Sequence, residues 1–374
     1  MQVTGETFVE RVVRATLHAR RTLMAGYTAV RDLGTEGAGD ADIQLRKCMT
    51  GPNALIPGPR YFCANRAIVT TGSYGTCPKS KINLNQEGIE GITGAEVADG
   101  EVECVKAVRR QVGAGADWIK IYAGVYGSRM SRTNVKVLSL RDRLSLPVPD
   151  GRRIERGIKG VHYNELDALI STANQLGVKV AAHSAHWHAR ADNGISSGPG
   201  VHTIEHGYNM IFDDDTITAL REDAPKSLSK TFWVPTLAAY YTMGQGKGEV
   251  WESAAKAFRR ALDKGIESIA CGGDTGVFAH GDNALEMKLM ARIGADWRKV
   301  LRWGTLGGWQ CIRSMALVGD NEVPFGAIRR GFAADIIATN GDLVNNFENA
   351  VDKTAIVFVM KGGKVYKRDG KGLV

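Results

Sequence analysis

Strand-like runs alternate with helix-like stretches along most of this chain, and this alternation restricts the possible fold more than any other feature. Strands that are separated by helices pair in parallel, and a long series of such units closes into a barrel. Active sites of such barrels lie at the carboxyl ends of the strands. The sequence therefore predicts an α/β fold, a TIM-like (β/α) barrel, with strands that begin near residues 28, 60, 118, 179, 203, 232 and 268.

The predicted series is one unit short of the eight strands of a complete barrel. Because the chain opens on a helix-like stretch at residues 6–25, we expect the first strand to be the missing one and the barrel to be distorted. Short β segments replace the alternation near the C-terminus. We therefore expect a barrel at residues 1–318 and a small β module at residues 319–374.

Valines recur at helical spacing in one of the intervening stretches, which predicts an amphipathic helix over residues 95–113. The valines on or near its expected apolar stripe are Val97, Val102, Val105, Val108 and Val112.

Composition limits the function classes. The apolar fraction of 44% and the charged fraction of 24% are ordinary for a globular protein. The net charge is +8, but the basic residues are scattered among acids, which argues against a nucleic-acid partner. No run approaches the length of a membrane span, so no membrane partner is expected. Six widely spaced cysteines without a Cys-x-x-Cys pair favour reduced thiols and a cytoplasmic protein.

The apolar run at residues 118–123 contains Lys120, and a lysine in a buried strand is costly unless it is neutralised or paired. Three later strand ends deliver His183, His206 and Asp274. Imidazole and carboxylate groups are common metal ligands, so the four residues together predict a metal site on the barrel rim. Alternatives remain for each residue alone. Lys120 could extend from a strand end into solvent, the histidines could be core residues, and Asp274 could cap its loop.

Several segments, in this order along the chain, resemble the metal-dependent amidohydrolase superfamily, and within it the imidazolonepropionase-like and prolidase-like branch. Any one segment is weak evidence, but their order and their placement on successive strands make the set specific. The resemblance runs from about residue 6 to the C-terminus, and its segments are residues 25–34, 57–60, 115–120, 182–183, 200–207, 234–237, 272–281 and 331–335.

The resemblance implies a hydrolase of amide, dipeptide or cyclic amide C–N bonds that uses one or two divalent metals, usually Zn²⁺. It implies that Lys120 is carboxylated and bridges the metals, which explains how a buried lysine is tolerated. His183 and His206 would bind one metal through neutral imidazole nitrogens. Asp274 would bind the other metal and would also be the catalytic residue that accepts a proton from the attacking water. The C-terminal β module would form part of a small β-sandwich.

The chain also departs from the family pattern. The family's first barrel strand ends in His-x-His, and no such motif precedes His18, which itself lies in a helix-like stretch. The second metal site is therefore expected to be incomplete, and hydrolysis by the chain as given to be impaired. The alternative is a pseudoenzyme, or a repurposed amidohydrolase-like catalyst with at most one metal. A His-x-His does occur at His186 and His188, either as a replacement ligand or, more simply, as loop histidines.

Three residues are candidates for contact with an amide or peptide-like small-molecule substrate. Tyr122 follows the lysine and His280 follows the aspartate, although packing or a hydrogen bond within the loop would also explain them. Tyr74 lies in a loop where relatives often place histidine. An incomplete barrel leaves unpaired strand edges, so we expect a homo-oligomer.

Overall fold

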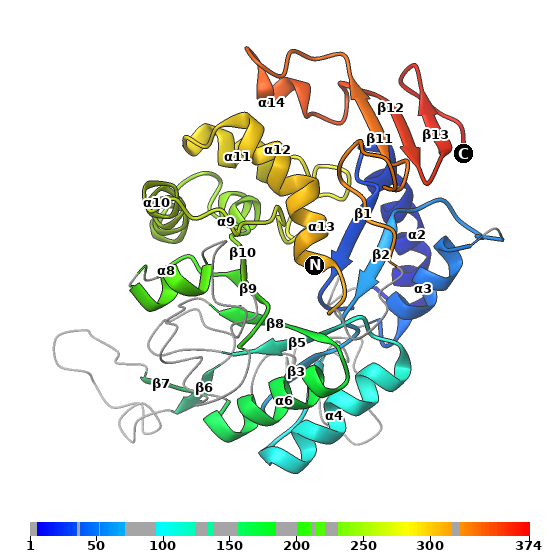
Figure 1. The fold of residues 1–374 in the computed structure, drawn as a ribbon. Helices are drawn as coiled ribbons and strands as arrows, with labels where there is room; N and C mark the ends of the chain where they lie inside the picture. Colours follow the sequence, from blue (N-terminus) through cyan, green and yellow to red (C-terminus); the bar gives the residue numbers. More distant parts are fainter. Residues whose placement is uncertain are drawn as a thin grey trace.

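A computed structural model shows parallel strands arranged as an arc, with helices along the outer side of the arc (Figure 1). The structure describes residues 6–35, 38–51, 53–71, 95–123, 134–137, 156–159, 161–184, 200–210, 212, 214–220, 231–315 and 322–374.

The strands are β1 (Ala29–Asp32), β2 (Arg60–Cys63), β3 (Ala67–Val69), β4 (Ala95–Val97), β5 (Trp118–Tyr122), β6 (Asn134–Val137), β7 (Arg156–Lys159), β8 (Lys179–Ser184), β9 (Thr203–His206), β10 (Phe232–Val234), β11 (Ile336–Thr339), β12 (Ile356–Lys361), β13 (Lys364–Arg368) and β14 (Lys371–Gly372). The helices are α2 (Phe8–Met24), α3 (Ala41–Met49), α4 (Gly100–Ala114), α6 (Tyr163–Gln175), α8 (Asp214–Leu220), α9 (Leu237–Met243), α10 (Glu249–Asp263), α11 (Leu285–Ile293), α12 (Trp297–Gly304), α13 (Leu306–Ile312) and α14 (Phe347–Ala350).

The central sheet has the strand order β10-β9-β8-β5-β3-β4, and every neighbouring pair in it is parallel. Strands β1 and β2 form a separate parallel pair, which a hydrogen bond from the Asp117 amide to the Cys63 carbonyl (2.8 Å) joins to the start of β5. At the other end, Ile269 adds a single parallel bridge to Trp233 of β10. The predicted strand positions and parallel pairing agree with this α/β TIM-like arrangement, although the expected strand near residue 268 is reduced to that bridge.

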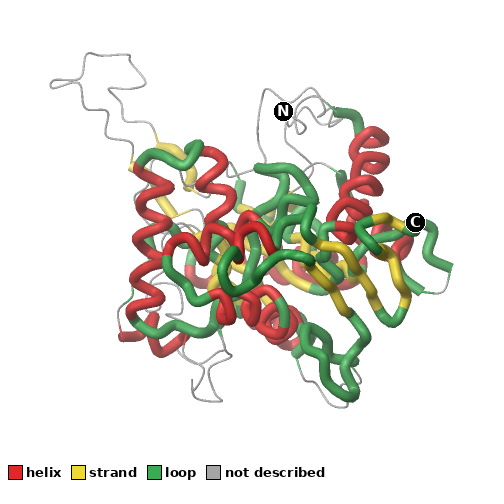
Figure 2. Tube along the Cα trace, turned by 90° about the horizontal axis from the view of Figure 1, so that it is seen from above, coloured by secondary structure: helices red, strands yellow, loops and turns green. Residues whose placement is uncertain are grey.

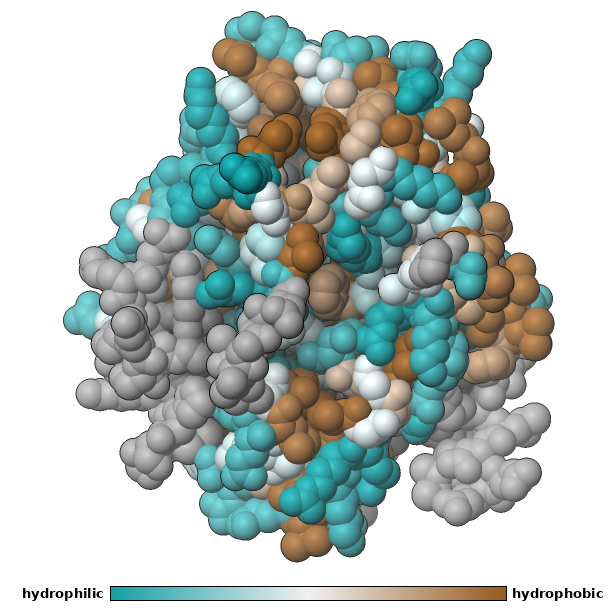
Figure 3. Space-filling view, turned by 45° about the vertical axis from the view of Figure 1, so that its right-hand side comes forward, coloured by the Kyte–Doolittle hydropathy of each residue, from teal (hydrophilic) through white to brown (hydrophobic). Residues whose placement is uncertain are grey.

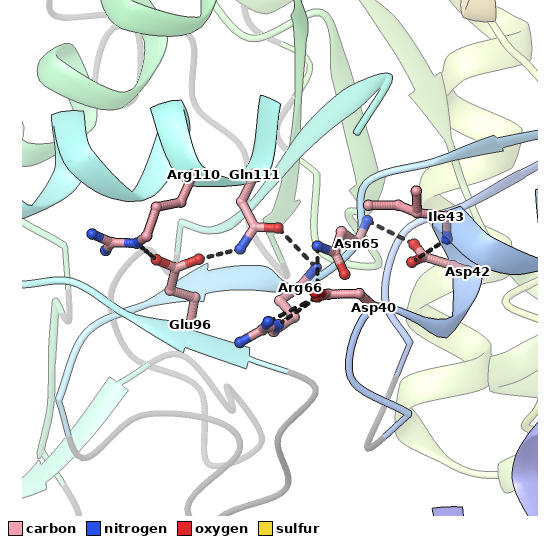
Figure 4. A network of polar contacts seen from close by, with 8 residues as sticks. All are labelled: Asp40, Asp42, Ile43, Asn65, Arg66, Glu96, Arg110 and Gln111. Atoms are coloured by element: carbon pink, nitrogen blue, oxygen red, sulfur yellow. Dashed lines mark hydrogen bonds and ion pairs between the residues drawn. The ribbon is translucent and has the colours of Figure 1, made fainter. Parts of the chain in front are cut away.

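The predicted strand at residues 60–68 is interrupted at Asn65, whose φ of 58° lies in the left-handed region. Around this bend the Asn65 amide donates to the Asp42 carboxylate (2.8 Å), and the Arg66 guanidinium pairs with Asp40 (2.7 Å), as Figure 4 shows. The Arg66 amide also donates to Gln111 of α4 (3.4 Å). These bonds stabilise the bend between β2, which pairs with β1, and β3, which pairs with β5.

The helix predicted over residues 95–113 begins later, at Gly100, because residues 95–97 pair with β3 as strand β4. The predicted valine stripe is only partly confirmed, since Val108 is buried and Val112 packs against the core. Val97 and Val102 are exposed, whereas the buried face of α4 consists of Cys104, Ala107, Val108 and Gln111.

The C-terminal strands form an antiparallel sheet with the order β11-β12-β13-β14. The end of helix α2 packs on this sheet, where Leu23 contacts Ile356, Val359 and Tyr366 in a small hydrophobic cluster. The Arg20 side chain also donates to the Val374 carbonyl (2.8 Å). Figure 2 shows the C-terminus and this sheet at one side of the molecule, near α2. The sheet and the first helix are therefore one packed unit, although they are far apart in sequence.

Hydrophobic and hydrophilic side chains are mixed over the face of the molecule shown in Figure 3. Four apolar side chains within the first ten residues of α2 are more than half exposed: Phe8, Val9, Val13 and Leu17. Within the part of the chain that the structure describes, no helix combines the length and hydrophobicity needed to cross a membrane.

Candidate active site

Six of the seven site residues predicted from the sequence line a single cavity of 1770 Å³. The cavity extends from the ends of the central strands to α2 and to the C-terminal sheet, so it is larger than ligand pockets of about 300–1,000 Å³. Tyr74, His186 and His188 lie outside the described residues. The six residues that line the cavity are Lys120, Tyr122, His183, His206, Asp274 and His280.

Strand β5 places Lys120 on the inner face of the arc. Side chains alternate along a strand, so Trp118, Lys120 and Tyr122 share one face, while Ile119 and Ile121 lie on the other face in the hydrophobic core. Lys120 is only 4% exposed, and its Nζ lies 5.8 Å from the centre of the Tyr122 ring. A lysine this deep in a strand requires a neighbour or a modification that compensates its charge.

His183 of β8 lies next to this lysine strand. It pairs in register with Tyr122, and the two ring centres are 4.6 Å apart. The His206 ring, from the end of β9, lies 4.2 Å from the His183 ring, at an interplanar angle of 57°. The parallel register of β5, β8 and β9 therefore brings the two imidazoles together at the carboxyl ends of the strands.

The backbone at His206 departs from the strand. Simple alternation would place Glu205 and His206 on opposite faces, yet both line the cavity. The φ of His206 is 78°, in the left-handed region, and this turns its side chain towards the side that Glu205 occupies. A bond from Trp233 Nε1 to the His206 carbonyl (2.8 Å) and another from the Gly207 amide to the Ser184 carbonyl (2.8 Å) stabilise this turn.

The His206 imidazole has a hydroxyl partner. Its Nδ1 lies 2.9 Å from Oγ1 of Thr236, the residue that precedes helix α9. If Nδ1 carries the proton, it donates to Thr236 Oγ1 and leaves Nε2 as the basic nitrogen. This arrangement is common for histidines that bind a metal through the second nitrogen.

Asp274 lies in the loop beyond Ile269, with a φ of 60°, and it is exposed to the cavity. The Asp274 carboxylate interacts electrostatically with the buried Glu286. The pKa of Glu286 is raised to about 8, mainly by burial and to a smaller extent by Asp274, although hydrogen bonds from Ala238 and Leu237 oppose the rise. The cavity wall near Asp274 therefore contains a second carboxyl group that the sequence analysis did not select.

His280 stacks on His18 of helix α2, with ring centres 4.0 Å apart and an interplanar angle of 14°. Burial, together with smaller effects of His18 and Arg21, lowers the pKa of His280 to about 4. Burial also lowers the pKa of His18, together with the nearby Arg14 and Arg21. Both rings are therefore neutral at pH 7, and they connect α2 to the loop after Asp274.

The residues present fit a divalent metal only if Lys120 takes part. The described residues hold no group of three or more His, Cys, Asp and Glu side chains close enough to share an ion. His183 and His206 supply two adjacent imidazoles, and a carbamate on Lys120 would supply an oxygen ligand from the same cavity. Two nitrogens and one oxygen match the protein ligands of a catalytic zinc site.

Thr236 and Glu286 belong to this site but were not predicted from the sequence. A signal for Thr236 was available, because it follows a strand-like run in one of the family segments. Glu286 gave a weaker signal, a single acid within the apolar pattern of residues 285–293. The partner of each lies far away in the sequence, so neither contact could be predicted from local pattern.

Comparisons with known proteins agree with this geometry. A model of the amidohydrolase family matches residues 10–366. The ochratoxinase of Aspergillus niger is 25% identical over an alignment of 374 positions, and this alignment covers 94% of this chain and 67% of that protein. A crystal structure of a Xaa-Pro dipeptidase with bound methionine superposes with a TM-score of 0.68 at 26% identity, over 95% of this chain and 79% of the other. The crystal structure of A. niger ochratoxinase, at 24% identity, has a TM-score of 0.68 over 96% of this chain and 77% of its own. At this identity the similarity shows a shared fold.

Proposed function

We propose a reaction for this chain, which belongs to the amidohydrolase family: the metal-dependent hydrolysis of an amide or peptide C–N bond. The chain is an amidohydrolase-type hydrolase, and members of its family generally bind divalent metals. The proposal rests above all on one observation, the pairing of His183 and His206 beside the buried Lys120 in a single cavity.

Three residues would hold the metal, for which we propose Zn²⁺. His183 and His206 would each donate an imidazole nitrogen, and Lys120, carboxylated at Nζ, would donate an oxygen. A bound Zn²⁺ would acidify a water molecule and polarise the carbonyl of the substrate. The carbamate also removes the positive charge of a lysine that is only 4% exposed, so it explains why the fold tolerates that side chain.

Asp274 would move the proton. Its carboxylate is exposed to the cavity and can accept a proton from the attacking water. The same oxygen would then donate this proton to the leaving nitrogen, which departs as a neutral amine when the C–N bond breaks. Tyr122, His280 and Tyr74 are proposed substrate contacts. The first two line the cavity, and their rings pack on His183 and His18, respectively.

We further propose that hydrolysis by the chain as given is weak and that it holds at most about one metal, because the described residues offer no group of three or more His, Cys, Asp and Glu side chains close enough to share an ion. The alternative, a pseudoenzyme or a catalyst repurposed on one metal, predicts bound metal without amide hydrolysis. We keep the division into a barrel at residues 1–318 and part of a β-sandwich at residues 319–374 as a proposal. A homo-oligomer is also proposed, and the exposed apolar side chains of α2 form a surface that could be covered in one.

The test is a hydrolysis assay with Zn²⁺-loaded protein on N-acyl amino acids and Xaa-Pro dipeptides, before and after treatment with a chelator. We expect amine release that the chelator abolishes and that added Zn²⁺ restores. His206→Asn should lose this activity, whereas a substitution of the exposed Lys256 should keep it. Metal-loaded protein that hydrolyses none of these compounds would favour the alternative, and hydrolysis that resists the chelator would contradict metal dependence.

A further inference from the structure

We infer that Glu286 of helix α11 is a positioning residue for His206, and that it acts through the first turn of helix α9 and through Thr236. The inference rests on the proposed function, in which His206 holds the metal. It concerns two residues that lie outside the proposed ligand set, and three contacts carry it.

The first two contacts join Glu286 to the start of α9. Its Oε1 accepts a hydrogen bond from the Leu237 amide (3.1 Å), and its Oε2 accepts one from the Ala238 amide (2.7 Å). Glu286 is only 1% exposed, so water cannot replace these bonds easily. The two amides are the first N–H groups of the helix, which have no partner within the helix itself.

The third contact joins α9 to His206. A threonine that precedes a helix normally accepts a bond from the first turn with its own hydroxyl. Thr236 makes no such bond, and its Oγ1 instead lies 2.9 Å from His206 Nδ1. Since Glu286 accepts from the amides of Leu237 and Ala238, the hydroxyl of Thr236 is left to bond the His206 imidazole and the Tyr240 side chain.

The backbone of Thr236 shows that this arrangement is enforced by its surroundings. Its φ of 51° and ψ of 43° lie in the left-handed region, which is unfavourable for a β-branched residue and unusual before a helix. The residue is buried, at 3% exposure. Glu286 fixes the two amides that follow, so it holds Thr236 in the conformation that presents Oγ1 to His206.

The consequence for His206 is a fixed tautomer. When Nδ1–H donates to Thr236, Nε2 is left as the nitrogen that can bind a metal. Two acceptor oxygens are required at position 286, because each oxygen of Glu286 accepts one amide bond. Glutamine has one acceptor, and its NH₂ group would meet an N–H group. Glu286→Gln would therefore leave one amide unsatisfied and give the Thr236 hydroxyl a competing partner.

The test measures the ¹⁵N chemical shifts of the histidine imidazoles in metal-free protein, with the His206 signals assigned by their loss in His206→Asn. The wild type should show His206 protonated at Nδ1. Glu286→Gln should show a mixture of tautomers, and a separate titration should show Zn²⁺ affinity about 10–100-fold lower. The matched control is Glu165→Gln, because Glu165 is also a buried carboxylate that accepts two amides, from Gly100 (2.7 Å) and His162 (2.7 Å).

Thr236→Val removes the hydroxyl at the other end of the chain of contacts, and it should change the His206 tautomer in the same way. In the Thr236→Val background, Glu286→Gln should have less than about a twofold further effect on Zn²⁺ affinity, because the two residues act along one path. An unchanged His206 tautomer in either folded single variant would overturn the inference. The NMR measurement needs no metal, so its outcome is independent of whether the proposed function is correct.

Discussion

The guanidinium of Arg31 and the carboxylate of Glu205 form a buried ion pair, 2.7 Å between Nη2 and Oε1, that joins strand β1 to strand β9. The side chains are 8% and 5% exposed, and both line the cavity. Arg31 also lies over the ring of Trp118, at 4.5 Å from its centre, and donates to Thr203 Oγ1 (3.2 Å). Arg31 thus links three strands of the arc.

Removal of one partner of this pair should be strongly destabilising. Arg31→Met leaves the Glu205 carboxylate buried without its cation, and we expect a loss of about 3–5 kcal/mol in the free energy of unfolding. The double variant Arg31→Met/Glu205→Leu should recover much of the loss, because no buried charge remains. Urea unfolding measures both. Arg298→Met is the control, since its pair with Asp296 is exposed and long (3.7 Å), and a change of at most about 1 kcal/mol is expected. Equal losses of stability in Arg31→Met and Arg298→Met would contradict a stabilising role of the buried pair.

Gly207 should resist substitution for two separable reasons. Its φ is +67°, and an added Cβ would lie 2.8 Å from Met210 Cε and 3.0 Å from Trp233 Nε1. Gly207→Ala should therefore destabilise the fold by more than the roughly 1–2 kcal/mol of the left-handed conformation alone. Gly265→Ala isolates that conformational part, because Gly265 has the same φ of +67° with nothing within 4 Å of an added Cβ. Thermal unfolding compares them, and equal effects would mean that the Trp233 contact does not matter.

The stability of the protein should decrease in acid partly because of His202. Burial and, to a smaller extent, Lys179 lower the pKa of His202 to about 3, whereas the unfolded value is about 6.5. Between pH 6.5 and 3 the unfolded chain therefore binds more protons than the folded chain, so the free energy of unfolding falls as the pH falls. The contribution is at most about 1.4 kcal/mol per pH unit.

His202→Asn tests this contribution. The asparagine oxygen can accept the bond that His202 Nδ1 now accepts from the Val180 amide (3.1 Å), but it cannot take up a proton. Urea unfolding between pH 7.5 and 5 should show a smaller pH dependence in the variant than in the wild type. Some dependence should remain, because the folded pKa values of His18 and His280 are lowered in the same direction. An identical pH dependence would show that folding does not shift the pKa of His202.

Much of the fold could be predicted from the sequence, because its main signals are local. The strand-like runs at residues 118–122 and 179–184 pair as expected, since each is a short apolar run after a helix-like stretch. The helix predicted from residue 95 failed at its start, because pairing of residues 95–97 with β3 is a tertiary effect that outweighs the local pattern.

For the candidate site, too, some features could be predicted from the sequence and others could not. Strand ends could be located from the sequence, so Lys120, His183 and His206 were found, and all three line the cavity. The positive φ of His206 could not be predicted, because a bond from Trp233, 27 residues later, helps to hold it. The Glu286 carboxylate bonds to residues 48 and 49 positions away, a distance at which no periodicity operates.

The measurement that tests the central claim most directly is the metal content per chain of the wild type and of Lys120→Ala, by elemental analysis after dialysis against Zn²⁺. If His183, His206 and a carbamate on Lys120 hold the ion, the wild type should retain about one Zn²⁺ per chain. Lys120→Ala should then retain almost none, and short carboxylic acids should restore part of it. Full metal content in Lys120→Ala, or two tightly held ions in the wild type, would contradict the account.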